Sequence, residues 1–389
     1  MKKPLSRRRF LTTSLAASAA SLPVIGAPKR PEYKGPNVII VRFGGGVRRR
    51  ETIDPDHTYA PFLIRELAKK GTLYTKMDIA QLEGLNTSHG EGTLNILTGK
   101  YDRYKNKEKQ ILGEHFEAKV PTVFEYLRKS FDVPDHQTLI VNGEDRTQEE
   151  FYSFSNHHLF GAQFKSNSLS LYRFKTYILR SDIAAGKWEG KELEQKRKEL
   201  KKMEDLDYRT EGKASGQGPE LDAYWSKWRE FYGDTGFVNP RGDRLLTELA
   251  IRAIKSLRPR LMMINYNDPD YVHWGNMSHY TRGISIIARG IEQLYATTQA
   301  DEHYRDRTVF VIVPDCGRDT NPFADVPCQH HFNSKSAHEI WALLLGPGIA
   351  KNIIVDKEVQ QISIAKTIGH TMGFRTKFTE GPLLEEAMA

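Results

Sequence analysis

The sequence predicts an α/β fold in which a mostly parallel central sheet is covered by helices on both faces. The first observation is a set of five short, strand-like runs that are mostly apolar, at 38–41, 138–141, 261–265, 309–313 and 341–345. The second is a set of helical patterns around these runs, at 60–70, 120–130, 245–257, 280–298 and 362–372. Uninterrupted apolar strands are buried on both faces, and their alternation with helices is typical of a covered parallel sheet.

The composition is that of a globular protein with a modest net charge. Hydrophobic residues make up 39% of the chain, which is enough to build a packed core. The formal net charge is +8, but five basic residues lie in the first 27 positions, which contain no acidic residue. The rest of the chain therefore carries +3. This balance argues against general nucleic-acid binding, because it requires no extended basic face.

The N-terminal segment resembles a twin-arginine export signal. In SRRRFLTTSLAASAASLPVIGA, Arg7 and Arg8 precede Phe10, Leu11 and a mildly apolar stretch rich in Ala and Ser. This stretch is too short and too polar to span a bilayer stably. We therefore expect a signal peptide at 1–27 and a protein of the periplasm or cell envelope with no stable membrane span. A disordered basic tail is the alternative.

The first predicted strand runs into three glycines and three arginines, in NVIIVRFGGGVRRRET. Backbone N–H groups around Gly45 could form a nest for an anion, since glycine adopts the backbone conformations that such a turn requires. Arg48, Arg49 or Arg50 would add positive charge, and the planar guanidinium matches a phosphate or sulfate. Alternatively, the glycines only permit a tight turn and the arginines are solvated.

The stretch from about 143 to 236 departs from the strand–helix rhythm. Its centre, GKELEQKRKELKKMEDLDYRTEGKASGQGPELD, begins as a highly charged helix and ends as a loop rich in Gly and Ser. Such a helix is typical of a solvated face with charge pairs four residues apart. We interpret the region as an insertion in a domain that spans 28–389, and it could form part of a lid.

Carboxylates and imidazoles lie next to three of the predicted strands. Asp315 follows the strand 309–313, and Asp270 and His273 follow the strand 261–265, while His330 and His331 precede the strand 341–345. Ligands of parallel sheets bind beyond the carboxyl ends of the strands. We therefore predict that these side chains converge on a divalent metal with oxygen and nitrogen ligands. Helix-capping aspartates and structural histidines are the alternative for each residue taken singly.

Six segments, in this order along the chain, resemble the alkaline phosphatase superfamily, which includes sulfatases, nucleotide pyrophosphatase/phosphodiesterases and phosphoglycerate mutases. They are PNVIIVRFGGG, GEGTLNILTGKY, NDPDYVHWGN, TVFVIVPDCGRD, ALLLGPGI and QISIAKTIGHTMGF. The resemblance covers most of the chain after the signal. It implies an alkaline phosphatase-like fold, two bound metals and hydrolysis of a phosphate or sulfate ester.

The chain departs from the superfamily pattern around one of the two metals. The Asp that ends the first strand in the pattern falls at Gly44, and the His of Asp-His-Gly falls at Cys316. The nucleophile position falls at His89, with Ser88 one residue away, and only Asp315 matches. Ser88 or Thr87 could act as the nucleophile only if the loop shifts by one or two residues, and His89 could instead act as a nucleophile or a general base. Alternatively, a bound metal activates water directly.

The resemblance is better kept around the other metal. Asp270, His273 and His331 match its ligand positions, and His330 is an uncertain substitute. We therefore expect one divalent ion, Zn, Ca or Mg, and a divergent metal-dependent hydrolase of a small anionic phosphate or sulfate ester. The alternative is a catalytically inactive envelope protein that holds an anionic ligand in the same cleft.

The two cysteines and the oligomeric state stay undetermined at this stage. Cys316 and Cys328 lie 12 positions apart in a loop-like stretch. An oxidising compartment would permit a disulfide between them, and two free thiols are equally consistent with the sequence. Neither the substrate nor the number of subunits follows from the residues alone.

Overall fold

The computed structural model describes most of the chain beyond the predicted signal segment, which itself lies outside the described residues. The described residues are 29–82, 87–102, 118–142, 157–205, 218–235, 242–273, 276–320, 328–330 and 334–389. Of the predicted site residues, only His331 lies outside them.

The strands form one mixed sheet that is mostly parallel, as predicted. They are β1 (Asn37–Phe43), β2 (Gly71–Asp78), β3 (Thr138–Asn142), β4 (Asn167–Leu169), β5 (Leu261–Asn265), β6 (Thr308–Pro314), β7 (Glu339–Leu345), β8 (Ile353–Val355) and β9 (Val359–Gln360). Their order is β4-β3-β5-β1-β6-β7-β2-β8, and β9 pairs with β2. Within the described residues, β7 alone runs antiparallel to its neighbours, β6 and β2.

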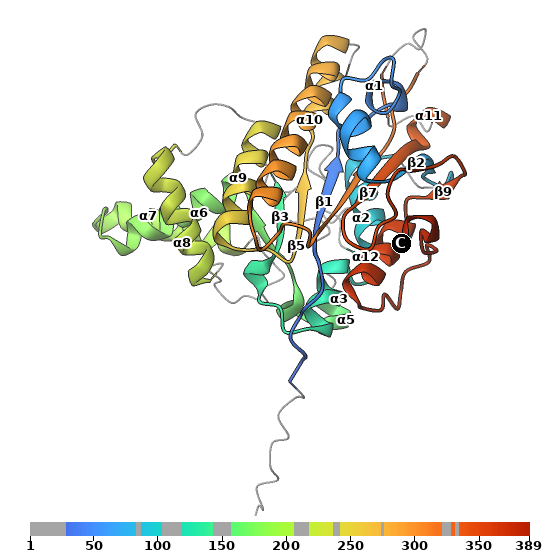
Figure 1. The fold of residues 1–389 in the computed structure, drawn as a ribbon. Helices are drawn as coiled ribbons and strands as arrows, with labels where there is room; N and C mark the ends of the chain where they lie inside the picture. Colours follow the sequence, from blue (N-terminus) through green and yellow to red (C-terminus); the bar gives the residue numbers. More distant parts are fainter. Residues whose placement is uncertain are drawn as a thin grey trace, which may run out of the picture.

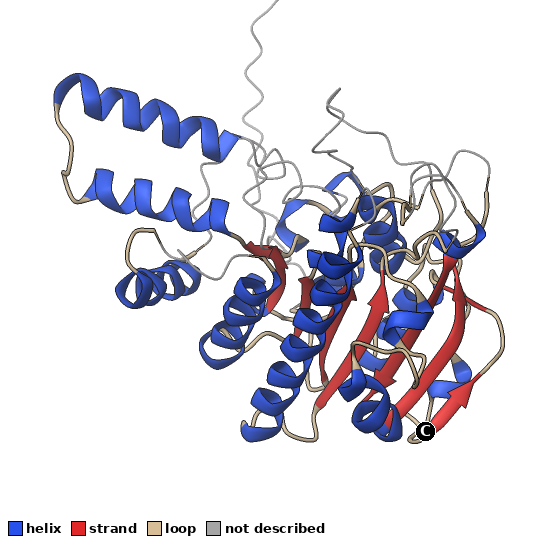
Figure 2. Ribbon diagram, turned by 90° about the horizontal axis from the view of Figure 1, so that it is seen from above, coloured by secondary structure: helices blue, strands red, loops and turns tan. Residues whose placement is uncertain are grey.

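Five of the longer helices pack on the two faces of this sheet (Figures 1 and 2). They are α2 (His89–Thr98), α3 (Val123–Ser130), α9 (Asp243–Ser256), α10 (Met277–Ala300) and α12 (Ser363–Met372). The other three are α6 (Leu171–Ala184), α7 (Gly190–Asp205) and α8 (Pro219–Tyr232). Shorter helical segments are α1 (Arg49–Thr52), η1 (Leu63–Leu67), η2 (Ala68–Lys70), η3 (Asp135–Gln137), α5 (His157–Phe160), η4 (Ala162–Phe164), η6 (Asp268–Val272), α11 (Lys335–His338) and η7 (Glu385–Ala387).

Alternate residues of each central strand belong to two separate apolar cores. In β1, Ile39 and Val41 face the core built with α9 and α10, whereas Val38 and Ile40 face the core built with α2, α3 and α12. All seven residues of β1 are buried. This two-sided burial is why the strand reads as an uninterrupted apolar run, since neither face meets water. The same holds for β3, β5 and β6, whose residues are also all buried.

The five predicted strands are confirmed, whereas the short β4, β8 and β9 and the longer β2 were not predicted. The eight residues of β2, GTLYTKMD, are buried only over the first half, and the second half alternates in exposure. Because β2 has one partly exposed end, its sequence lacks the continuous apolar run by which the other strands are recognised.

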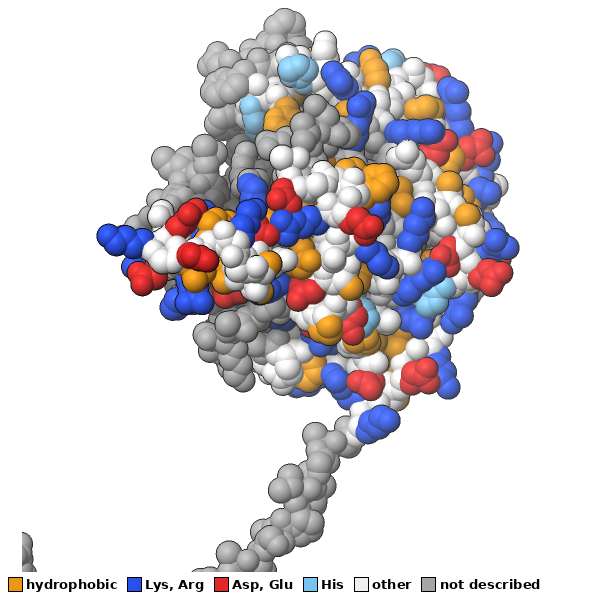
Figure 3. Space-filling model, turned by 90° about the vertical axis from the view of Figure 1, so that its left-hand side faces the viewer, with side chains coloured by type: hydrophobic (Ala, Val, Ile, Leu, Met, Phe, Trp, Pro, Cys, Tyr) orange, Lys and Arg blue, Asp and Glu red, His pale blue; other side chains and the backbone are white. Residues whose placement is uncertain are grey.

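The region interpreted as an insertion contains α6, α7 and α8, which lie beyond the β4 edge of the sheet (Figure 1). Trp225 and Trp228 of α8 are buried in the same core as Phe174 of α6. On the face of the molecule shown in Figure 3, positive and negative side chains are interspersed. Among the described residues, no helix is both long and apolar enough to cross a membrane.

The direction of β7 brings the segment that precedes it to the carboxyl end of β6. Because β7 is antiparallel to β6, its first residues lie beside the last residues of β6. A segment that precedes a parallel strand would lie at the opposite edge of the sheet. The reversal therefore places His330 at the same edge as the residues that follow β5 and β6.

Candidate functional site

The site is centred on one carboxylate oxygen, which three imidazoles approach. Asp270 Oδ1 lies 2.6 Å from His273 Nε2, 3.0 Å from His89 Nε2 and 3.2 Å from His330 Nε2. Asp270 and His273 come from the loop after β5, His89 from the start of α2, and His330 from the segment before β7. The structure thus brings together four residues that the sequence singled out.

Two of these imidazoles are oriented through their second ring nitrogen. His330 Nδ1 lies 2.9 Å from the backbone carbonyl oxygen of Thr87, and His273 Nδ1 lies 2.9 Å from Gln329 Oε1. A carbonyl oxygen only accepts, so Nδ1 of His330 carries the proton and donates it. Nε2 of the neutral ring then presents a lone pair to the carboxylate of Asp270. Two acceptors that face each other need a proton or a cation between them.

The loop that carries Asp270 is anchored by a buried carboxylate at the start of α9. Asp243 accepts hydrogen bonds from the backbone N–H groups of Asn267, at 2.8 Å, and of Asp268, at 2.7 Å. Asp268 in turn accepts one from the Asp243 backbone N–H at 3.1 Å. Burial, and then the nearby Asp268 charge, hold the pKa of Asp243 well above its ordinary value. This reciprocal contact ties the start of η6 to α9.

The second carboxylate, Asp315, is fully buried and receives backbone donors. Its oxygens accept from the N–H groups of Cys316 at 2.8 Å, Gly46 at 3.3 Å and Gly45 at 3.4 Å. The glycine turn does form a nest of N–H groups. Its occupant is a carboxylate of the chain itself, however, so the predicted role of Gly45 in binding a substrate anion is not supported by these contacts.

Two cationic side chains complete the surroundings of Asp315. Arg42, at the end of β1, lies 3.5 Å from Asp315 Oδ2 and also donates to Thr93 Oγ1 at 2.9 Å. His89 Nδ1 lies 2.7 Å from the same Asp315 oxygen. Although burial raises the pKa of Asp315, His89 and Arg42 bring it well below its usual range.

His89 bridges the two carboxylates through its two ring nitrogens. Burial lowers the pKa of the imidazole, but the charges of Asp270 and Asp315 outweigh it and raise that pKa well above 6.5. Gly92 lets α2 come close enough for this bridge, because a Cβ at that position would lie 2.1 Å from the Asp315 carbonyl oxygen. His89 is therefore an imidazole paired with a carboxylate on both sides.

Gly44, which directly follows the first strand, has no room for a side chain. A Cβ added there would lie 2.1 Å from the backbone oxygen of Tyr266 and 3.1 Å from Arg42 Nε and Asp315 Oδ2. Arg42 and Asp315 thus lie side by side next to Gly44. Arg42 was not predicted from the sequence, because a polar residue near the end of a strand carries no distinctive signal.

Arg318 is a second buried cation that sequence reasoning missed. Its side chain is fully buried, and it donates to the carbonyl oxygens of Gly46 at 2.7 Å, of Gly45 and of Cys328. It also lies 3.5 Å from Asp270 Oδ1. Arg318 therefore joins the glycine turn to the Asp270 half of the site. The available signal was its position three residues after Asp315.

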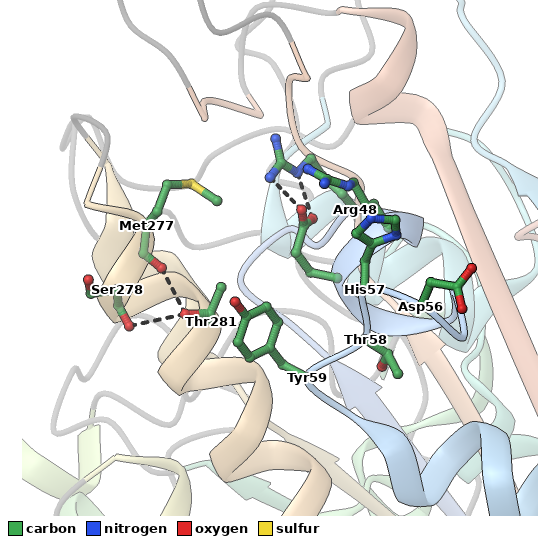
Figure 4. A pocket seen from close by; sticks show the side chains of 10 residues that line it. Arg48, Asp56, His57, Thr58, Tyr59, Met277, Ser278 and Thr281 are labelled. Carbon is green, nitrogen blue, oxygen red and sulfur yellow. Dashed lines mark hydrogen bonds and ion pairs between the residues drawn. The ribbon is translucent and has the colours of Figure 1, made fainter.

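The arginines predicted to bind substrate make other contacts. Arg48 forms two hydrogen bonds with Glu51, at 2.6 and 2.7 Å, and Arg49 pairs with Asp78 at 3.1 Å. Arg48 also lines a separate surface cavity of about 530 Å³, together with the exposed Arg50 (Figure 4). The positive charge beside Gly44–Gly46 is supplied by Arg42 and Arg318 instead. Arg42 lies near the end of β1 and Arg318 in the loop after β6, and both side chains lie at the same edge of the sheet.

The remaining predicted residues have local roles. Ser88 is the N-cap of α2, since its hydroxyl accepts from the Glu91 backbone N–H at 3.2 Å and contacts Glu91 Oε2 at 3.1 Å. Cys316 and Cys328 are both buried and free, with no disulfide between them. Burial raises the pKa of the Cys316 thiol to about 11.

Two overlapping sets of side chains have the spacing of metal ligands. Asp270, His273 and His330 form one set, and His89, Cys316 and His330 form the other. Within each set the ligand atoms lie within 4.8 Å of one another. The two sets share His330, so two groups of possible metal ligands overlap at this one imidazole within the described residues.

Solved structures of alkaline phosphatase superfamily proteins share this fold. A superfamily protein from Vibrio parahaemolyticus matches with a TM-score of 0.52 and 15% identity over 92% of this chain and 71% of its own. A mutant of alkaline phosphatase PafA matches with a TM-score of 0.54 and 9% identity, over 92% of this chain and 99% of its own. A phosphonate monoester hydrolase from Silicibacter pomeroyi matches with a TM-score of 0.51 and 13% identity, over 92% and 76%.

No family model and no curated protein sequence matches the chain. The structural matches confirm the predicted resemblance to the alkaline phosphatase superfamily as a likeness of fold. At identities of 9–15%, these matches show a shared fold but do not assign functions to individual residues of this chain.

Proposed function

We propose that this alkaline phosphatase-like chain is a metal-dependent hydrolase of a phosphate or sulfate ester. It holds one divalent ion at Asp270, His273 and His330, and His331 stays a candidate ligand. The supporting observation is that the imidazoles of His273 and His330 both approach Asp270 Oδ1 through Nε2. The Nδ1 atom of each ring is already engaged in a hydrogen bond. Outer-shell partners of this kind are typical of metal-ligating histidines.

The spacing of these donors fits a small tetrahedral cation. With bonds of about 2.0–2.2 Å, such an ion keeps its ligand atoms roughly 3.3–3.5 Å apart. Here Asp270 Oδ1 lies 2.6 Å from His273 Nε2 and 3.2 Å from His330 Nε2. A shift of a few tenths of an ångström for His330, and somewhat more for His273, would admit the ion. One carboxylate and two imidazoles also match the donor composition of catalytic zinc sites.

When bound, the ion would supply Lewis-acid stabilisation of the ester oxygens and a lowered pKa for a nearby water. Within the chain, His89 holds a proton between Asp270 and Asp315, and we assign it the general acid–base role. Ser88 caps α2, so of the two predicted catalytic residues His89 is favoured. Arg42 and Arg318 contribute fixed positive charge that does not depend on the ion.

The experiment is metal analysis of the purified protein together with turnover of aryl phosphate, phosphodiester and sulfate substrates. We expect about one ion per chain, and both the ion and turnover lost in Asp270→Ala. His370→Ala is the matched control, because His370 is exposed on α12 and lies in neither ligand set. A protein with neither metal nor turnover would refute the proposal.

The export assignment is a separate part of the proposal. We assign residues 1–27 as a cleaved twin-arginine signal and the mature chain to the periplasm or cell envelope. The support is the Arg7–Arg8 motif with its short, mildly apolar stretch. Mass spectrometry of the protein recovered from its native envelope should give a mature N-terminus near residue 28. An intact Met1 in that fraction would contradict cleavage.

An inactive anion-binding protein is the second candidate, and one observation favours it. The nucleophile position carries an imidazole paired with two carboxylates, and Gly44 leaves no room for a second-metal ligand. A ligand that binds only the folded state raises its stability. A thermal-shift screen of small phosphate and sulfate esters would favour this function if a stabilising ester were recovered intact. Recovery of the hydrolysed ester would favour the enzyme.

A further inference from the structure

We propose that a cavity beside the start of β7 binds a primary alkylammonium, that is, a small amine in its charged form. The cavity has a volume of about 410 Å³ and shares no lining residue with the cavity in Figure 4. None of the described residues with the spacing of metal ligands lines it. This inference is therefore independent of the proposed hydrolase function.

Three carboxylates line this cavity. Asp78 and Glu339 are paired residues of the antiparallel strands β2 and β7, so their side chains lie on the same face of the sheet. Glu358, just before β9, is the third. Like charges opposite each other on two strands repel. Burial raises the pKa of Asp78, and although Arg49 lowers it, the charges of Glu358 and Glu339 help to hold it above its ordinary value.

The basic side chains of the cavity balance these carboxylates only in part. Arg49 lies 3.1 Å from Asp78 Oδ1 and 3.8 Å from Glu339 Oε2, so one guanidinium serves two carboxylates. Lys335 is exposed, and its ammonium lies 4.0 Å from Glu339 Oε1. The ammonium of Lys76 is engaged by a carboxylate that does not line the cavity. Negative charge is therefore left for a bound cation to neutralise.

A buried imidazole adds an acceptor to the same cavity. The Nδ1 atom of His338 lies 2.9 Å from the backbone carbonyl oxygen of Ile79, and this oxygen can only accept. Burial lowers the pKa of the imidazole, so the neutral ring donates through Nδ1 and keeps a lone pair on Nε2.

This lone pair is left without a donor. In the described part of the chain, Nε2 of His338 has no hydrogen-bond partner, and the residue is only 4% exposed. A buried acceptor without a partner costs free energy, which a donor on a ligand would recover. Because Nε2 is covered by neighbouring atoms, this contact requires a small rearrangement of the side chains that line the cavity.

The chemistry of these groups matches a primary ammonium. Such a group carries one positive charge and three N–H donors. Its donors would meet Nε2 of His338 and the carboxylates of Asp78 and Glu339. Ile79 and Ala80 line the same cavity and offer apolar contact to the attached carbon chain. A divalent metal fits less well, because no three described side chains of this cavity have the spacing of metal ligands.

The test is isothermal titration calorimetry of the full-length protein with n-butylammonium chloride at neutral pH. A ligand of this size reaches roughly micromolar affinity at best, so the titration extends to millimolar concentrations. We expect saturation at one equivalent. Tetramethylammonium, which lacks the N–H donors, and n-butanol, which lacks the charge, should each bind at least about 10-fold more weakly.

Glu339→Gln removes one carboxylate charge and should weaken the binding of n-butylammonium about 10-fold. Glu248→Gln is the matched control, because the side chain of Glu248 is 35% exposed, against 34% for Glu339, and also pairs with an arginine. It lies on α9, outside the cavity, and its replacement should leave the affinity unchanged. Glu358→Gln, at an exposed position, should weaken binding without affecting folding.

An absence of saturable binding at millimolar n-butylammonium would overturn the proposal. Equal losses of affinity in Glu358→Gln, Glu339→Gln and Glu248→Gln would also overturn it. So would equally tight binding of tetramethylammonium, which would indicate diffuse attraction of cations, or of n-butanol, which would indicate a site for neutral alcohols. Displacement of n-butylammonium by one equivalent of Ca would show a metal site instead. None of these results would alter the proposed ion at Asp270.

Discussion

Asp270 and Asp315 follow neighbouring parts of the same sheet edge but differ in their surroundings. Asp315 is fully buried and is met by three backbone N–H groups, by Arg42 and by His89. The side chain of Asp270 is 24% exposed and is met mainly by imidazoles, with His89 among them. His89 is common to both carboxylates, and the other partners differ: those of Asp315 stay protonated at every relevant pH, whereas the imidazoles around Asp270 can release a proton.

This difference separates the two halves of the site by what their partners can offer an ion. A backbone N–H and a guanidinium cannot exchange their hydrogen bonds for a metal, since neither offers a lone pair. A neutral imidazole does offer one. The Asp315 side, which includes Arg42, is therefore held mainly by donors, and the Asp270 side contains side chains with the spacing of metal ligands.

The largest expected effect comes from breaking the Asp315 half. Asp315→Asn removes the charge that pairs with the buried Arg42, and removal of one partner of a buried pair costs about 3–5 kcal/mol. We expect that loss in the free energy of unfolding, measured by urea titration of the metal-free protein. A loss below about 1 kcal/mol would mean that the buried pair does not stabilise the fold.

Gly44→Asp tests whether the second metal position can be recovered. We expect no additional ion by metal analysis and a destabilisation of about 1–3 kcal/mol or more, because the new side chain would overlap the Tyr266 carbonyl oxygen. Gly186→Asp is the control, since a Cβ there meets nothing within 4 Å. Its left-handed backbone should cost no more than about 1–2 kcal/mol. A second ion bound by Gly44→Asp would show that the turn can rearrange.

Gln329→Ala tests the Asp270 half through the partner that orients His273. Loss of an outer-shell partner typically lowers metal affinity about 10–100-fold. We expect that loss in a competition titration with a chelator, because the imidazole is no longer held at its Nδ1 nitrogen. The metal-free stability should change by only about 1 kcal/mol. An unchanged affinity for zinc would remove His273 from the ligand set.

The pH dependence of stability should report on Asp315 through the difference between the native protein and Asp315→Asn. The folded-state pKa of Asp315 lies well below its unfolded value, so the stabilisation is complete above about pH 5 and declines as the pH falls through the unfolded pKa of about 3.9. Between pH 5 and 3 the stability difference between the native protein and Asp315→Asn should narrow by about 1 kcal/mol. A gap that widens on acidification would contradict this assignment.

Arg50→Ala should have the smallest effect and separates the surface cavity from the site. Arg50 is exposed and lines the cavity in Figure 4, so its removal should change stability by less than about 0.5 kcal/mol and leave metal affinity unchanged. A raised KM with unchanged kcat would indicate that the cavity contacts the substrate. A change in metal affinity would contradict the separation of the two regions.

The central strands and most of the candidate ligands could be predicted from the sequence, and the compensating cations could not. The run 261–264 is apolar throughout because β5 is buried on both faces, so the position of Asp270 beyond the end of this strand was predictable. Arg42 and Arg318 carry no local pattern, since their roles arise from contacts with residues more than 40 positions away. The antiparallel direction of β7, which brings His330 to this edge of the sheet, also cannot be predicted from the hydrophobic periodicity.

By itself the sequence determined which segments are buried on both faces and which polar side chains follow these segments, because buried strands have an apolar local composition. Only the tertiary structure decided the order and direction of the strands, and with them the partners of each carboxylate. Pairing between strands depends on contacts across long stretches of chain, which no local pattern records. The filled space around Gly44 is a consequence of that arrangement.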